Sequence, residues 1–187
     1  MTDKITYLNE GDWAIITRTS LEIFDNKGLI AIRAIRTVQN DSTSIDKGGH
    51  RHFMAKEIAE QPSVLTNALG YYIQNNKIVL PYPGLDFAQI DRLTMVACGT
   101  AFYACLVAKY WFEQIARLPV EIDVASEFRY REPPISKGTA ALFVSQSGET
   151  ADTLAALRYC EGKVDNIVAV VNVPESSIAR ESNLPLP

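Results

Sequence analysis

Apolar runs alternate with helix-like segments along the second half of the chain. The predicted strands cover residues 93–97, 120–124, 140–144 and 166–171, and the predicted helices cover residues 101–116 and 151–160. The strand at 166–171 is almost entirely apolar, as expected for a strand that is buried on both faces of a sheet. Strand and helix therefore alternate from residue 93 onward. This pattern predicts an α/β fold with an open parallel sheet flanked by helices.

The amino-terminal third has a different pattern, in which short β-rich runs are separated by polar residues. These runs lie at residues 13–17, 21–24 and 29–32. Between the last two, residues 25–28 predict a turn that ends in a glycine with positive φ. The pattern predicts a small β meander, whose apolar face needs a partner sheet.

The segment between these two parts predicts a linker followed by helices. Residues 41–49 are rich in Ser, Thr, Asp and Gly, as linkers are. Residues 52–60 predict one helix, and Pro62 suits the first turn of a second helix that runs to about Leu69. Residues 78–80 predict a short extended piece.

Polar residues gather at the turn between the strand at 140–144 and the helix at 151–160. The hydroxyl and amide side chains there belong to Ser145, Gln146, Ser147 and Thr150. Gly148 allows a positive φ, and the free N–H groups of a helix start favour an anion such as phosphate. Ser147 or Thr150 could instead simply cap the helix, and for this turn alone capping is the favoured interpretation. This turn alone does not distinguish phosphate binding from capping.

A second turn of the same kind follows the strand at 93–97. Its residues are Cys98, Gly99 and Thr100, and a long apolar helix comes next. In an open parallel sheet, ligands bind beyond the carboxyl ends of the strands, where loops from neighbouring strands converge. We therefore expect the two turns to face one ligand.

Several stretches of the chain resemble the glutamine–fructose-6-phosphate aminotransferase family, also called glucosamine-6-phosphate synthases. They are residues 97–100, 109–113, 125–131 and 145–153. Upstream, residues 51–62 resemble the segment that opens the isomerase half of that family, and residues 8–12 resemble the tail of its glutaminase half. The resemblance covers nearly the whole chain.

The resemblance implies a domain organisation. Residues 1–36 would be the carboxyl-terminal remnant of a type 2 amidotransferase (glutaminase) domain, 37–49 a linker, 50–92 a helical lead-in, and 93–187 a truncated first SIS (sugar isomerase) module. Family members have an amino-terminal nucleophilic cysteine, where Thr2 follows Met1 here, and a second SIS module that carries the isomerase lysine, glutamate and histidine. We therefore expect this chain alone to be inactive and assign it no catalytic residue.

The resemblance also implies a substrate. The family transfers ammonia from glutamine to fructose 6-phosphate, which gives glucosamine 6-phosphate and glutamate without a metal or an organic cofactor. Matched position by position, the sugar phosphate would be held by Ser145, Gln146, Ser147 and Thr150, with Cys98, Gly99 and Thr100 lining the sugar. Ala101 stands where family members often have serine, which removes one hydroxyl ligand. The family also implies a homodimer.

Composition excludes several classes of partner. The 187 residues are 47% hydrophobic and 21% charged, as in an ordinary globular protein. A net charge of −4 argues against nucleic acid. No apolar run approaches the ~20 residues of a membrane span, and the amino terminus does not resemble a signal peptide, so we expect a cytoplasmic protein. The three cysteines show no CxxC spacing, which predicts reduced thiols and no zinc site.

Three functions remain open. The chain is a part of the aminotransferase, a stand-alone SIS-type regulatory module that senses a sugar phosphate, or a pure interaction protein. The glutaminase-like residues 1–36 favour the first. We interpret Glu149 and Asp152 as carboxylates that interact favourably with the dipole of the helix, rather than as acid/base catalysts. We interpret residues 109–112 as core and dimer packing, and residues 126–131 as a packed corner or an interface.

Overall fold

The computed structural model describes residues 4–37, 46–80 and 86–187. The chain divides into two compact units, Met1–Asn67 and Ala68–Pro187, which are described separately below. Of the predicted linker at 41–49, residues 41–45 lie outside the described residues.

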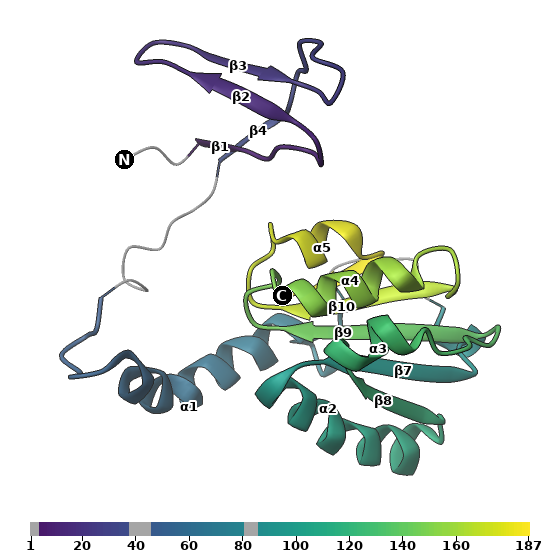
Figure 1. The fold of residues 1–187 in the computed structure, drawn as a ribbon. Helices are drawn as coiled ribbons and strands as arrows, with labels where there is room; N and C mark the ends of the chain where they lie inside the picture. Colours follow the sequence, from purple (N-terminus) through teal and green to yellow (C-terminus); the bar gives the residue numbers. More distant parts are fainter. Residues whose placement is uncertain (1–3, 38–45, 81–85) are drawn as a thin grey trace. The chain divides into compact units, whose positions relative to one another are not determined.

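A five-stranded sheet forms the centre of the second unit (Figure 1). Its strands are β7 (Arg92–Ala97), β8 (Val120–Val124), β9 (Thr139–Ser145), β10 (Asn166–Val171) and β11 (Leu184–Leu186). The order across the sheet is β11-β10-β9-β7-β8, and all neighbours are parallel. This arrangement confirms the predicted α/β fold with an open parallel sheet.

Helices lie on both faces of this sheet. They are α2 (Gly99–Trp111), which continues as a π-helical turn (Phe112–Ala116), α3 (Ala125–Arg131), α4 (Ala151–Cys160), α5 (Ser177–Glu181) and the short 3-10 helix η2 (Phe87–Gln89). Because side chains alternate between the faces of a strand, Phe143 packs with α3, α4 and α5 while Ala140 packs with α2. Phe128 on α3 is buried and Tyr130 is exposed, so residues 126–131 form a packed helix with one free face.

The exposed face of α2 corrects one interpretation. Tyr110 and Trp111, which we expected in core and dimer packing, are 58% and 61% exposed, so their place in the core is wrong and dimer packing stays a prediction. Cys105, one turn or more before them on the helix, is the residue of α2 that is buried against the sheet. Tyr110 and Trp111 therefore lie outside the core, whereas Phe102 and Cys105 of the same helix pack against the sheet.

The segment predicted as two helices is one helix, α1 (Phe53–Tyr72), with Pro62 inside it. A proline in a helix removes one N–H donor, and it does not end the helix if the flanking residues stay helical. Hydroxyl groups beside it add bonds to helix carbonyls: Ser63 Oγ donates to the Glu60 carbonyl and Thr66 Oγ1 to the Pro62 carbonyl, each at 2.8 Å. The predicted break at Pro62 is therefore wrong.

The strand β5 (Ile73–Gln74) follows α1, and a two-residue turn connects it to β6 (Lys77–Ile78). Asn75 and Asn76 form this turn with φ of 51° and 60°, as a tight hairpin requires. Of the extended piece predicted at 78–80, only Ile78 lies in a strand, which is β6.

The first unit contains two antiparallel strand pairs. They are β2 (Trp13–Ile16) with β3 (Leu21–Phe24), and β1 (Lys4–Thr6) with β4 (Ile35–Thr37). The turn at 25–28 has the predicted positive φ at Gly28, 75°. The prediction of a third meander strand at 29–32 is wrong. The Asp25 carboxylate accepts the N–H of Leu29 at 2.9 Å, which draws the chain into the turn. Of residues 29–32, only Ile30 forms a β-bridge, with Phe24.

The meander buries little apolar surface. Among the described residues of this unit, Ile23 is the only buried hydrophobic side chain. Ile16, Ile30 and Ile32 are 77%, 78% and 93% exposed. The apolar side chains expected to need a partner sheet are thus without one in the described part of the chain.

Candidate functional site

The two predicted turns meet at the point where the order of the sheet reverses. From β7 the chain passes to β8 on one side and then to β9 on the other, so the carboxyl ends of β7 and β9 lie side by side. Helix α2 begins directly after β7, and α4 begins after the turn that follows β9. In folds of this type, the crevice at such a reversal is where ligands bind.

A pocket of about 310 Å³ opens between these two turns. It is lined by Cys98, Gly99, Thr100, Ala101, Val144, Ser145, Gln146, Ser147, Thr150 and Thr153. All seven residues predicted for the site therefore lie around one cavity. An adjoining hollow of about 350 Å³ shares Thr100, Ser145 and Gln146 with it and extends to Asn172, so a ligand larger than a phosphate ion has room.

Hydrogen bonds within the turn after β9 fix its shape. The Gly148 N–H donates to Ser145 Oγ at 3.1 Å, and Ser145 Oγ is joined to Thr150 Oγ1 at 3.0 Å. The Glu149 N–H donates to Ser147 Oγ at 3.2 Å. Thr150 occupies the N-cap position of α4, but its side chain makes no capping bond to the helix. The first N–H groups of α4 are therefore left for a ligand.

Gly148 is required by a close approach as well as by its φ of 65°. A Cβ at this position would lie 1.9 Å from the hydroxyl oxygen of Ser176, which is buried and caps α5 through the Ala179 N–H. The Ile178 N–H also donates to the Gly148 carbonyl at 3.0 Å. The start of α5 thus holds the turn in place, which preorganises it for a ligand.

The turn after β7 has the same character. Cys98 is the N-cap of α2 without a side-chain capping bond, and Gly99 has a φ of 57°. Two helices therefore begin at the pocket with uncapped first turns. Each helix start carries a partial positive charge and N–H donors that suit an anion.

No lysine or arginine is among the residues that line this pocket in the described part of the chain. Binding of an anion here would rest on N–H groups and hydroxyl groups, as in other helix-start phosphate sites. Glu149 and Asp152 do not line the pocket. Glu149 Oε1 accepts the Ser177 N–H at 2.7 Å, and Asp152 pairs with Arg129 at 3.0 Å. Both carboxylates are therefore bonded to protein groups outside the pocket lining.

The thiols differ in their accessibility. Cys98 is half-buried at the pocket, whereas Cys105 and Cys160 are buried. Burial raises the pKa of Cys105 to about 11 and that of Cys160 to about 12. No cluster of three or more potential metal ligands occurs among residues 4–37, 46–80 and 86–187.

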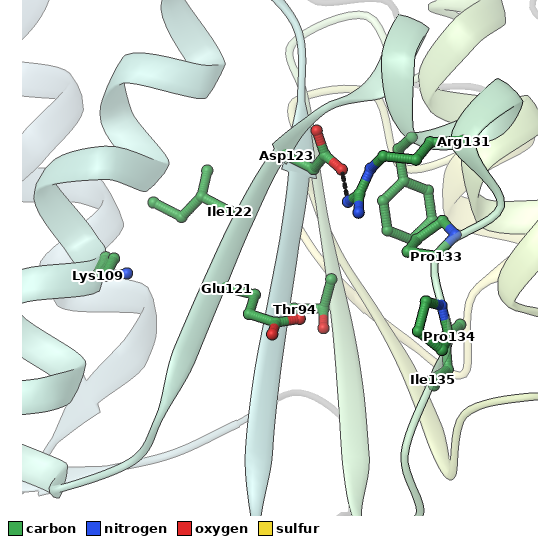
Figure 2. A pocket seen from close by; sticks show the side chains of 10 residues that line it. Thr94, Lys109, Glu121, Ile122, Asp123, Arg131, Pro133, Pro134 and Ile135 are labelled. Atoms are coloured by element: carbon green, nitrogen blue, oxygen red, sulfur yellow. Dashed lines mark hydrogen bonds and ion pairs between the residues drawn. The ribbon is translucent and has the colours of Figure 1, made fainter.

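Two other cavities suit a phosphate less well. One of about 390 Å³ lies beside β8 (Figure 2). Its charged side chains belong to Lys109, Glu121, Asp123 and Arg131. Figure 2 shows Arg131 bonded to Asp123, and Lys109 pairs with Glu113 at 3.5 Å, so these cations already have anionic partners. The other, of about 430 Å³, has only apolar and cysteine side chains among its lining residues.

Sequence reasoning missed Thr153 and the supporting residue Ser176. Thr153 lies in the first turn of α4, after the polar run that marks the predicted site, and Ser176 is far from the turn in sequence. The approach of Ser176 to Gly148 depends on the tertiary fold. No sequence signal could have found it.

Comparisons with known proteins identify the family of this chain. The SIS domain family model matches residues 86–186. Glutamine–fructose-6-phosphate aminotransferases (isomerizing) are similar over the whole chain: that of Brucella abortus is 54% identical and that of Bradyrhizobium diazoefficiens 56%. The chain spans 31% of the length of these relatives.

No helix in the described ranges is long and apolar enough to cross a membrane.

Solved structures give the same result. The carboxyl-terminal domain of a glucosamine-fructose-6-phosphate aminotransferase from Francisella tularensis matches with a TM-score of 0.71 and 38% identity, over 75% of this chain and 40% of that one. A glucosamine-6-phosphate deaminase from Thermotoga maritima shares the fold, with a TM-score of 0.56 and 24% identity over 71% of this chain and 39% of that one. The chain therefore belongs to the SIS domain family, and over its whole length it is similar to one segment of the glutamine–fructose-6-phosphate aminotransferases.

Proposed function

We propose that this chain binds fructose 6-phosphate in the pocket between the two turns, as the sugar-phosphate-binding part of a glutamine–fructose-6-phosphate aminotransferase. The observation that carries the proposal is the pocket at the reversal of the sheet, where α2 and α4 both begin without side-chain caps. The relatives' name supplies the substrate. In the reaction that this name describes, glutamine and fructose 6-phosphate give glucosamine 6-phosphate and glutamate.

The phosphate is the part of the substrate that this pocket recognises. Ser145, Gln146, Ser147 and Thr150 supply polar side chains beside the N–H groups of the helix starts. Cys98, Gly99 and Thr100 line the sugar. Hydrogen bonds to a charged group contribute about 1.5–3 kcal/mol each. Ala101 adds no hydroxyl, so backbone N–H groups of α2 take a larger share of the binding.

The other roles follow from the same assignment. Residues 93–187 serve as the sugar-phosphate module, 50–92 as its lead-in, 37–49 as a linker and 1–36 as the end of a glutaminase domain. A homodimer and a cytoplasmic location stay predictions. No feature of the described residues favours the stand-alone sensing module over this assignment.

Isothermal titration calorimetry tests the proposal. Fructose 6-phosphate is expected to bind and fructose is not, because the site recognises the phosphate. Ser147→Ala should weaken the affinity about tenfold, since it removes one hydroxyl donor to a charged group. Ser182→Ala is the matched control, because Ser182 Oγ donates to the Ala179 carbonyl at 2.9 Å, outside the pocket. Equal binding of fructose and fructose 6-phosphate would contradict the proposal.

A further inference from the structure

Thr153 carries a buried hydroxyl group that has no hydrogen-bond partner. The residue is 1% exposed, and its Oγ1 is the only buried side-chain oxygen or nitrogen without a partner in the part of the chain that the structure describes. Buried polar groups in folded proteins are almost always bonded, because an unsatisfied group loses its bonds to water without replacement. Such a group calls for an explanation.

The position of Thr153 supplies one. It is the third residue of α4, after the N-cap Thr150, and it lines the candidate pocket. The Cα–Cβ bonds of a helix tilt toward its amino terminus, so this side chain points back toward the helix start. The Thr153 hydroxyl thus belongs to the same end of α4 as Ser147 and Thr150.

The local alternatives for this hydroxyl are not used. A threonine in a helix commonly donates to the carbonyl three or four residues before it, which here would be that of Thr150 or Glu149. Neither bond is made. The Thr150 carbonyl instead accepts the Leu154 N–H at 2.9 Å. The nearby hydroxyl groups of Ser145 and Thr150 are bonded to each other.

Another buried threonine shows the contrast. Thr139 is 2% exposed, and its Oγ1 donates to the Ser136 carbonyl at 2.6 Å. A threonine that serves the fold alone is therefore bonded in this chain. Thr153 is equally buried, lies at the pocket and is not bonded.

We propose that Thr153 is a further binding residue of the pocket and that its hydroxyl donates to a phosphate oxygen of the bound sugar phosphate. This inference rests on the proposed function. In the structure the hydroxyl oxygen is closed off from water. A helical threonine has two populated χ1 states, and the change between them moves the hydroxyl and the methyl group. A phosphate in the pocket satisfies the hydroxyl after this rotation.

The test combines affinity with thermal stability for Thr153→Val, Thr153→Ser and Thr139→Val. Thr153→Val keeps the shape and removes the hydroxyl, so it should leave Tm unchanged or raise it while it weakens binding of fructose 6-phosphate about tenfold. Thr153→Ser keeps the hydroxyl and should bind as the unchanged chain does. Thr139→Val should lower Tm, because it leaves the Ser136 carbonyl without its donor, and should not change the affinity.

The outcomes separate this inference from the proposed function. If the unchanged chain binds fructose 6-phosphate and Thr153→Val binds it equally well, the inference alone is overturned. A fall in Tm for Thr153→Val, or its failure to fold, would make the hydroxyl structural and would also overturn it. An unchanged chain that does not bind fructose 6-phosphate at all overturns the proposed function, and the inference with it.

Discussion

Replacement of Gly148 by alanine is expected to destabilise the chain and to disturb the pocket at once. The new Cβ would lie 1.9 Å from Oγ and 2.4 Å from Cβ of Ser176. A change of side-chain rotamer moves only the first of these two atoms. The backbone at Ser176 or the turn at Gly148 must therefore shift, and both belong to the contact that holds the start of α5 against the turn.

The magnitude follows from two separate costs. An alanine at a φ of 65° loses about 1–2 kcal/mol, because its Cβ approaches the following carbonyl oxygen in the left-handed conformation. Displacement of Ser176 removes the N-cap of α5, which costs about 1 kcal/mol. The free energy of unfolding should therefore fall by about 2–3 kcal/mol.

Two control variants separate these costs. Gly162 has a φ of 71°, and a Cβ there would meet nothing within 4 Å, so Gly162→Ala reports the backbone cost alone, about 1–2 kcal/mol. Ser176→Gly removes both clashing atoms, and glycine at an N-cap costs only a few tenths of a kcal/mol. The double variant Gly148→Ala with Ser176→Gly should therefore be more stable than Gly148→Ala alone.

Urea unfolding followed by circular dichroism measures all four variants. A double-mutant cycle then isolates the coupling between positions 148 and 176, because the two residues are in contact. If Gly148→Ala is no more destabilising than Gly162→Ala, or if Ser176→Gly does not rescue it, the close approach does not constrain the turn and the reasoning fails.

Two further predictions concern thiols and pH. A thiol reagent at pH 8 should label Cys98 rapidly, and Cys105 and Cys160 only after unfolding, because burial raises the pKa of Cys105 to about 11 and that of Cys160 to about 12. Rapid labelling that persists in Cys98→Ala would contradict this. The hydrogen bond from Arg158 lowers the pKa of Glu181 below 4.5, so this pair contributes stability above pH 4.5 that is lost as pH falls through the lowered pKa. The difference in urea midpoint between the unchanged chain and Glu181→Gln should therefore shrink at acid pH, and a constant difference would show that the pair does not titrate in this way.

The sequence predicts well those elements whose pattern and environment agree. The strands at 120–124 and 166–171 and the helix at 151–160 match the structure to the residue. The strand at 166–171 and the helix at 151–160 are also bounded by polar or turn residues, and the strand at 120–124 begins after Pro119. The seven residues predicted for the site line one cavity because parallel strands place their carboxyl ends at one edge of the sheet, so two separate turns converge there.

The failures arise where one local signal is overridden by its neighbours or where the pattern does not report packing. Pro62 predicts a break that the flanking helical residues override. The sequence favours core and dimer packing for Tyr110 and Trp111, which lie outside the core, because a sequence pattern does not show which face of α2 meets the sheet. The role inferred for Thr153 depends on the absence of a hydrogen-bond partner for its hydroxyl group, which only the three-dimensional structure reveals.

Backbone amide NMR shifts during a titration with fructose 6-phosphate test whether both turns hold one sugar phosphate. We expect saturable shifts at residues 99–101 and 146–153 together, with fructose giving none at equal concentration. Shifts confined to the cavity beside β8, or shifts in one turn without the other, would contradict it.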